Sequence, residues 1–92
     1  MNNQTDWGII GGGIMGMTLA LRLIEKGHKV TIYESAEKAG GLASTWQMNN
    51  ITWVRFYHVI LMSDLNTRNV LKEIGLENEL NWVETKTGFY SD

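Results

Sequence analysis

Residues 11–16 are the segment that most restricts how this chain of 92 residues folds. They read Gly-Gly-Gly-Ile-Met-Gly and match the spacing G-x-G-x-x-G, with the apolar pair Ile9-Ile10 just before them. In this spacing Gly11 permits a tight turn, Gly13 lets another group approach the backbone, and Gly16 allows a helix to pack closely on a strand. The segment therefore predicts a strand, a glycine loop and a helix in succession.

The residues after the loop continue this pattern into a helix and a second strand. Gly27 stands where a glycine commonly ends a helix, and the next segment is rich in β-branched and aromatic residues, which favour a strand. Four residues recur at helical spacing on one face, and most of them are small: Gly16, Ala20, Leu23 and Gly27. We predict parallel strands over Asp6–Ile10 and Lys29–Tyr33, with a helix over Ile14–Lys26 between them.

An acidic residue, Glu34, ends the second predicted strand. An acid about 20 residues after a glycine loop is placed to accept a hydrogen bond from a ribose 2′-hydroxyl. The N–H groups in the first turn of a helix favour a phosphate. Together these features predict a βαβ dinucleotide-binding site, and the carboxylate disfavours NADP because it repels a 2′-phosphate. The alternative is a βαβ unit in which the glycine turn is incidental.

A glycine pair, Gly40-Gly41, follows this unit. The succession of the glycine loop, Glu34 and this pair resembles the N-terminus of FAD-dependent amine oxidases and of protoporphyrinogen oxidase-like and phytoene desaturase-like flavoenzymes. The resemblance continues through residues 41–46, Gly-Leu-Ala-Ser-Thr-Trp, and residues 57–60, Tyr-His-Val-Ile. It spans most of the chain, as the opening segment of a far longer enzyme.

The resemblance implies an FAD-binding segment with a role for each motif. The glycine loop would hold the pyrophosphate, the acid would hold the adenosine ribose, and the double glycine would run beside the pyrophosphate toward the flavin. Many members have an arginine after the double glycine, where this chain has the uncharged Leu42, so the resemblance does not carry that charged phosphate contact over to this chain. The candidate cofactor-binding residues are Gly11, Gly13, Ile14, Met15, Gly16, Glu34, Ser35, Gly40, Gly41 and Leu42.

The second half of the chain predicts further short elements. Asn49-Asn50 favours a tight turn, so we expect a hairpin between residues 44–48 and 51–54. Residues 55–61 continue as an extended apolar segment, in which Arg55, Tyr57 and His58 either line a flavin or substrate pocket or belong to a half-buried strand. The second interpretation, a half-buried strand, is favoured. After it we predict a helix capped by Ser63 or Asp64 and ending at Ile74-Gly75, a helical turn over Leu76–Leu80, and a strand over Trp82–Thr87.

Composition excludes several classes of function. The net charge of −2 offers no basic surface for nucleic acid, and no apolar run approaches the roughly 20 residues of a membrane span. Cysteine is absent, which excludes disulfides and thiolate chemistry. The polar N-terminus lacks the pattern of a signal peptide, so the cytoplasm is the default compartment. No catalytic base, nucleophile or metal cluster can be assembled from His58, because this histidine has no partner residue.

The predicted fold is α/β: an incomplete Rossmann-like βαβ dinucleotide-binding unit, then a β-hairpin and a helix. We interpret residues 1–92 as the N-terminal part of an FAD/NAD(P)-binding domain, inactive alone, within a flavin-dependent oxidoreductase. A complete domain of this type has five or six strands, so open sheet edges favour self-association. Two alternatives remain: a fragment of an NAD-dependent dehydrogenase, against which the double glycine argues, and a non-catalytic nucleotide-binding or interaction module.

Overall fold

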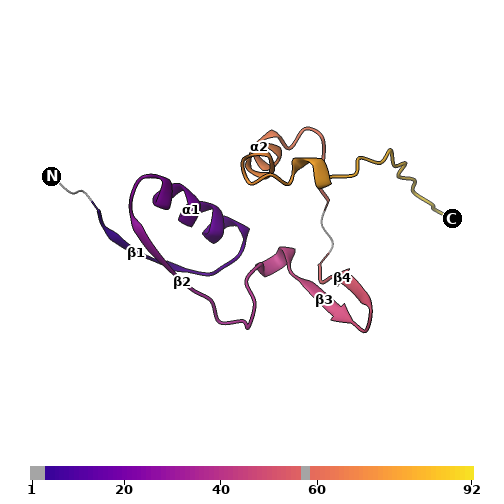
Figure 1. The fold of residues 1–92 in the computed structure, drawn as a ribbon. Coiled ribbons are helices and arrows are strands. Elements are labelled where there is room, and N and C mark those ends of the chain that lie inside the picture. Colours follow the sequence, from indigo (N-terminus) through magenta and orange to yellow (C-terminus); the bar gives the residue numbers. More distant parts are fainter. Residues whose placement is uncertain (1–3, 57–58) are drawn as a thin grey trace. The chain divides into compact units, whose positions relative to one another are not determined.

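The structure, a computed structural model, describes residues 4–56 and 59–92. Its contacts divide the chain into one unit that ends at residue 58 and a second over residues 59–92, and each is treated by itself. Figure 1 shows the elements in chain order: β1 (Asp6–Ile10), α1 (Ile14–Glu25), β2 (Lys29–Tyr33), the 3-10 turn η1 (Gly41–Ala43), β3 (Thr45–Met48), β4 (Ile51–Val54), α2 (Leu65–Glu73) and the 3-10 turn η2 (Glu77–Glu79).

The first unit begins with the predicted βαβ motif. β1 and β2 are parallel, with Asp6 opposite Lys29 and Ile10 opposite Tyr33. α1 links the two strands and packs against both of them (Figure 1). It starts at Ile14, directly after the glycine loop, as the sequence predicts. The α/β class and the parallel pairing are therefore confirmed.

A glycine ends α1 through a Schellman motif. Gly27 has a φ of 86°, a conformation that costs a residue without Cβ little. Its N–H donates to the carbonyl of Ile24 at 2.9 Å, and the N–H of His28 donates to the carbonyl of Leu23 at 3.0 Å. The helix ends at Glu25, one residue earlier than predicted, because Lys26 is the C-cap.

Few apolar side chains of the described residues are buried. Ile9 of β1 and Ala20 of α1 are 8% and 5% exposed, and no other hydrophobic side chain in residues 4–56 and 59–92 is buried. A sheet of two strands covered by one helix leaves most of its apolar surface in contact with solvent. Ile10, at 92% exposure, is the extreme case. The βαβ unit therefore contributes only a small hydrophobic core.

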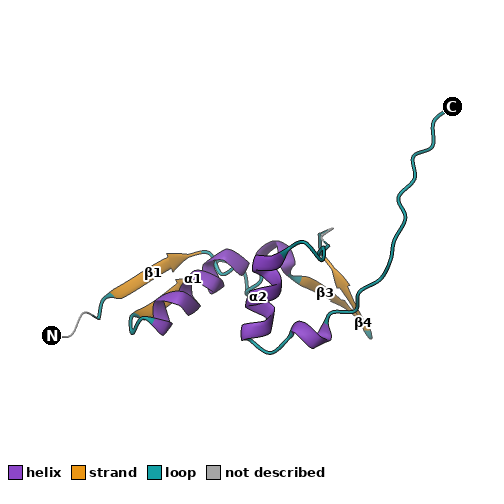
Figure 2. Ribbon diagram, turned by 90° about the horizontal axis from the view of Figure 1, so that it is seen from above, coloured by secondary structure: helices purple, strands orange, loops and turns teal. Residues whose placement is uncertain are grey.

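The predicted hairpin forms with β3 and β4 antiparallel, as Figure 2 shows. Asn49 has a φ of 54° at the turn, a conformation that asparagine tolerates better than most residues. On one face, the hydroxyl of Thr52 donates to the side-chain carbonyl of Gln47 at 2.7 Å. Because alternate strand residues share a face, the other face is wholly apolar and exposed: Trp46, Met48, Ile51 and Trp53.

The second unit is built on α2, which also ends at a glycine. Gly75 has a φ of 80°, and the N–H of Leu76 donates to the carbonyl of Leu71 at 2.8 Å. Asp64 is the N-cap residue, as predicted, but its side chain does not cap the helix. Its Oδ2 accepts a hydrogen bond from the N–H of Leu61 at 2.8 Å instead. The expected helical turn after Gly75 is the 3-10 turn η2.

Arg68 of α2 connects the parts of this unit. It donates to the carbonyl of Met62 at 2.8 Å and lies 3.7 Å from the carboxylate of Glu77 in η2. Its guanidinium also lies over the ring of Trp82, 5.4 Å from the centroid. One arginine therefore ties the helix to the segments before and after it.

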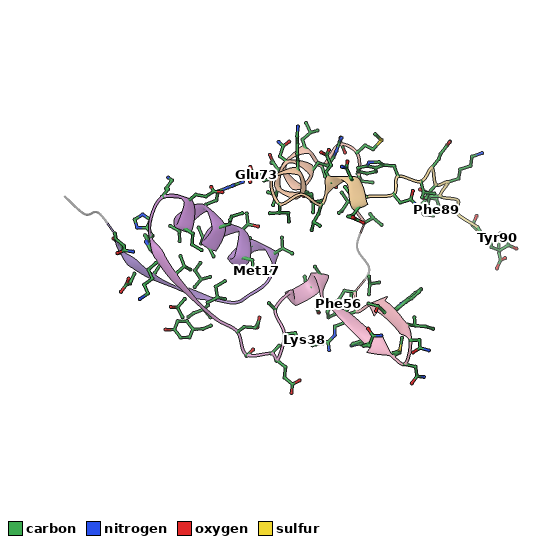
Figure 3. The ribbon with its side chains drawn as sticks, viewed as in Figure 1. Met17, Lys38, Phe56, Glu73, Phe89 and Tyr90 are labelled. Atoms are coloured by element: carbon green, nitrogen blue, oxygen red, sulfur yellow. The ribbon has the colours of Figure 1, made fainter. Side chains whose placement is uncertain are left out.

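The two segments predicted to be extended contain no strand in the part that the structure describes. Residues 82–87 form no strand. Phe89 and Tyr90, whose side chains are labelled near the C-terminal end in Figure 3, are 98% and 92% exposed. In the segment 55–61, residues 55–56 bend and 59–61 have no regular structure, while Tyr57 and His58 lie outside the described residues. Strand-forming residues need a partner strand, and the described parts of these segments have none.

Within residues 4–56 and 59–92, neither helix has the length and hydrophobicity of a membrane-spanning segment.

Candidate dinucleotide-binding site

The glycine loop is anchored at the end of β2. Gly11 has a φ of 103°, which turns the chain out of β1. Its N–H donates to the carbonyl of Tyr33 at 2.8 Å. This hydrogen bond extends the parallel pairing by one residue and fixes where the loop starts.

Gly16 sets the distance between α1 and the loop. A Cβ atom added at Gly16 would overlap the carbonyl oxygen of Gly11 and would lie 3.4 Å from Cγ2 of Ile9. Because the obstacle is backbone, no side-chain rotation relieves it. Only glycine allows α1 to lie this close to the loop and to β1.

Gly13 faces open space at the start of α1. A Cβ atom added there would have one neighbour within 4 Å, the Cα of Gly41 at 3.9 Å. Gly13 is also the N-cap of α1, so no side-chain oxygen caps the helix, and its first turn has no acidic residue. The N–H groups of a first turn have no partner within their helix. The combination leaves donors and free volume where an anion can approach the backbone.

Glu34 lies beside the glycine loop and holds it. Its Oε1 accepts a hydrogen bond from the N–H of Gly12 at 3.2 Å, and its Oε2 accepts one from the N–H of Ala36 at 3.4 Å. Gly12 is buried, and sequence reasoning missed its role because it occupies a variable position of the motif. The carboxylate is therefore oriented toward the loop by two backbone donors.

The double glycine, Gly40-Gly41, lies against the backbone of Gly12 and Gly13. The N–H of Gly40 donates to the carbonyl of Gly12 at 2.8 Å, and Gly40 pairs with Gly13 in a parallel bridge. Gly40 and Gly41 have φ angles of 127° and 55°. A Cβ atom added at Gly41 would lie 3.2 Å from the Cα of Gly13. The two glycine segments thus pack backbone against backbone, which side chains would prevent.

Two cavities adjoin this network, and Glu34 borders both. The smaller, of about 560 Å³, lies at the strand ends and is lined by Ile10, Gly11, Ile32, Tyr33, Glu34 and Ser35. The larger, of about 920 Å³, extends from the glycine loop to the hairpin. Its lining includes Ile14, Glu34, Gly40, Gly41, Trp46 and Arg55.

The structure brings most of the candidate residues together. Gly11, Ile14, Glu34, Ser35, Gly40 and Gly41 line one cavity or the other, and Gly13 contacts Gly41. Three candidates line neither: Gly16 packs inside the unit, while Met15 and Leu42 are 86% and 73% exposed.

The sequence also indicated Arg55, Tyr57 and His58 as alternative pocket-lining residues. Arg55 lines the larger cavity, whereas Tyr57 and His58 are outside the described chain. In the turn between α1 and β2, His28 accepts a hydrogen bond at Nδ1 from the N–H of Thr5 at 3.2 Å. The described residues contain no cluster of His, Cys, Asp or Glu that could hold a metal ion.

Comparison with known proteins gives one family. The profile of the flavin containing amine oxidoreductases matches residues 14–91. The 15-cis-phytoene desaturase of Narcissus pseudonarcissus is 29% identical over 77 residues, which are 83% of this chain and 14% of that protein. The 4,4′-diapophytoene desaturase of Staphylococcus haemolyticus is 32% identical over 78 residues, 85% of this chain and 15% of its own length.

A relative with a different printed activity matches over the same part of the chain. The hydroxysqualene dehydroxylase of Sinorhizobium fredii is 34% identical over 74 residues, which are 78% of this chain and 18% of that protein. The chain thus spans less than a fifth of the length of each of these curated relatives.

Proposed function

The chain belongs to the family of flavin-containing amine oxidoreductases, and on this premise we propose that it binds the ADP half of FAD for a flavin-dependent oxidoreductase. The observation that carries the proposal is the network around Gly12. Its N–H bonds to Glu34 and its carbonyl accepts from Gly40. The glycine loop, Glu34 and the double glycine are separate in the sequence, and they therefore meet at Gly12.

Each segment has a distinct proposed role. The uncapped start of α1, with the open space beside Gly13, accepts the pyrophosphate, because backbone N–H groups donate to it and no side chain stands in the way. Glu34 accepts hydrogen bonds from the ribose hydroxyls, using the lone pairs that Gly12 and Ala36 leave available. The double glycine keeps the neighbouring backbone free of side chains.

These residues bind and orient the cofactor and do not perform the chemistry. When bound, a flavin supplies the redox chemistry by accepting a hydride, and the protein supplies position and electrostatics. Among the described residues we assign no catalytic acid, base or nucleophile. The compartment that we propose for the protein is the cytoplasm.

The test is the Glu34→Ala variant, with Glu79→Ala, an exposed acid in the second unit, as the matched control. A charge-assisted hydrogen bond contributes about 1.5–3 kcal/mol, so Glu34→Ala should weaken binding of FAD and ADP about 10- to 100-fold. The Kd is measured by calorimetry, and Glu79→Ala should not change it.

Two results would contradict the proposal. An unchanged Kd in Glu34→Ala would show that the acid only supports the loop. Tighter binding of NAD than of FAD by the wild-type chain would favour the dehydrogenase interpretation. Absorbance gives a direct check, because a bound flavin is yellow and a bound nicotinamide is not.

A further inference from the structure

The larger cavity contains two basic side chains that the proposed site does not use, Lys38 and Arg55. Lys38 lies on the loop between β2 and η1 (Figure 3). Arg55 is the residue directly after β4. Both reach a cavity that is also lined by the carboxylates of Glu34 and Glu37.

Arg55 is held in place at both of its ends. Its backbone N–H donates to the carbonyl of Ser44 at 3.2 Å. Its guanidinium lies over the ring of Trp46, 5.9 Å from the centroid, a cation–π arrangement that restrains its direction. Among the described residues, its guanidinium has neither an ion-pair partner nor a hydrogen-bond acceptor. The side chain is therefore oriented while its donors stay available.

Apart from Lys38 and Arg55, no described residue that lines the two cavities carries a positive charge for a diphosphate. The glycine loop and the start of α1 offer N–H groups only, and Leu42, directly after the double glycine, is uncharged. Glu34 and Glu37 make the cavity less favourable for an anion. An arginine suits the task better than a lysine, because its planar fork pairs with two phosphate oxygens at once.

We propose that Arg55 is a cofactor-binding residue that pairs with the pyrophosphate of the dinucleotide while Trp46 holds its guanidinium in place. This inference rests on the proposed function, since it assigns a further residue to the same site. It also gives the hairpin a role in binding: β3 and β4 supply the platform that carries the arginine to the cavity.

The experiment compares Arg55→Ala and Arg55→Lys with Arg22→Ala, an arginine of α1 that is ion-paired to Glu25 at 3.3 Å. Kd values are measured on the full chain with FAD, ADP, adenosine and riboflavin. Arg55→Ala should weaken binding of FAD and ADP about 10- to 100-fold and leave adenosine unchanged. Arg55→Lys should recover part of the loss, and Arg22→Ala should behave as wild type.

Salt gives a second readout that a structural role would not change. Because salt screens an arginine–phosphate pair, raising the ionic strength should weaken ADP binding more in the wild type than in Arg55→Ala. Far-UV circular dichroism confirms that the variants fold, and Arg55 is exposed, so its replacement leaves no cavity.

The possible outcomes separate this inference from the proposed function. Wild-type binding of FAD with an unchanged Kd for ADP in Arg55→Ala would overturn the role of Arg55 alone. Equal losses for adenosine and ADP would assign Arg55 a structural role, and a loss confined to FAD and riboflavin would place it at the flavin ring. If the wild type binds neither FAD nor ADP, both proposals fail.

Discussion

The substitution Gly16→Ala sets two effects of similar size against each other. Alanine is a better helix former than glycine by about 1 kcal/mol, so helix propensity alone predicts a more stable protein. The tertiary contact predicts the opposite, since the new Cβ would overlap the carbonyl oxygen of Gly11 and crowd Ile9. Overpacking typically costs about 1–3 kcal/mol.

The structure indicates which effect is larger. The overlapping atom belongs to the backbone of the glycine loop, and Gly11 is tied to Tyr33 by a hydrogen bond of 2.8 Å. Because neither the backbone of Gly11 nor that of Tyr33 can rotate away from the new Cβ, α1 must shift as a whole. The cost of overpacking therefore lies at the upper end of its usual range. We therefore expect a net loss of about 2 kcal/mol, which lowers the urea midpoint by about 2 M for a chain of this size.

The matched control is Gly12→Ala, in the same loop. There the new Cβ would lie 3.4 Å from Cβ of Glu34 and 3.5 Å from Cγ2 of Ile32, which are ordinary contacts, and the backbone φ is not positive. Such a substitution changes stability by less than about 1 kcal/mol. Urea unfolding followed by circular dichroism measures both variants. A Gly16→Ala midpoint at or above that of wild type would refute the close approach of α1 to the loop.

Three further predictions follow from the same geometry. Gly13→Val should retain the helical circular dichroism signal and lose ADP binding in calorimetry, because Gly13 has an ordinary φ of −78° and only Gly41 nearby; retained tight binding would refute the phosphate assignment. Gly27→Ala should lower the free energy of unfolding by about 1 kcal/mol, because its φ of 86° is unfavourable for a residue with a Cβ although nothing lies within 4 Å of the new atom; an unchanged urea midpoint would contradict this. Trp53→Lys, which places a charge beside Trp46 on the exposed face of the hairpin, should reduce self-association in light scattering, whereas an unchanged mass would exclude this face as the contact.

The sequence by itself was sufficient for the elements that depend on local backbone preference. Gly27 and Gly75 both adopt positive φ and end their helices, and Asn49 takes the left-handed conformation at the hairpin turn. The parallel pairing of β1 with β2 was also predicted, because a strand, a helix and a strand in close succession have few other ways to connect. In each case the deciding residues lie next to the element that they shape.

The convergence of distant segments was decided by the tertiary structure. The hydrogen bond between Gly12 and Glu34 joins residues 22 positions apart, and no spacing rule marks Gly12 as its donor. The position of Arg55 over Trp46 likewise depends on how β3 and β4 pair. For residues 82–87, tertiary structure overruled a local preference: their side chains favour a strand, but no partner strand lies alongside them in the described chain. Local propensity acts within a few residues, whereas a binding site and a sheet both require surfaces that only folding brings together.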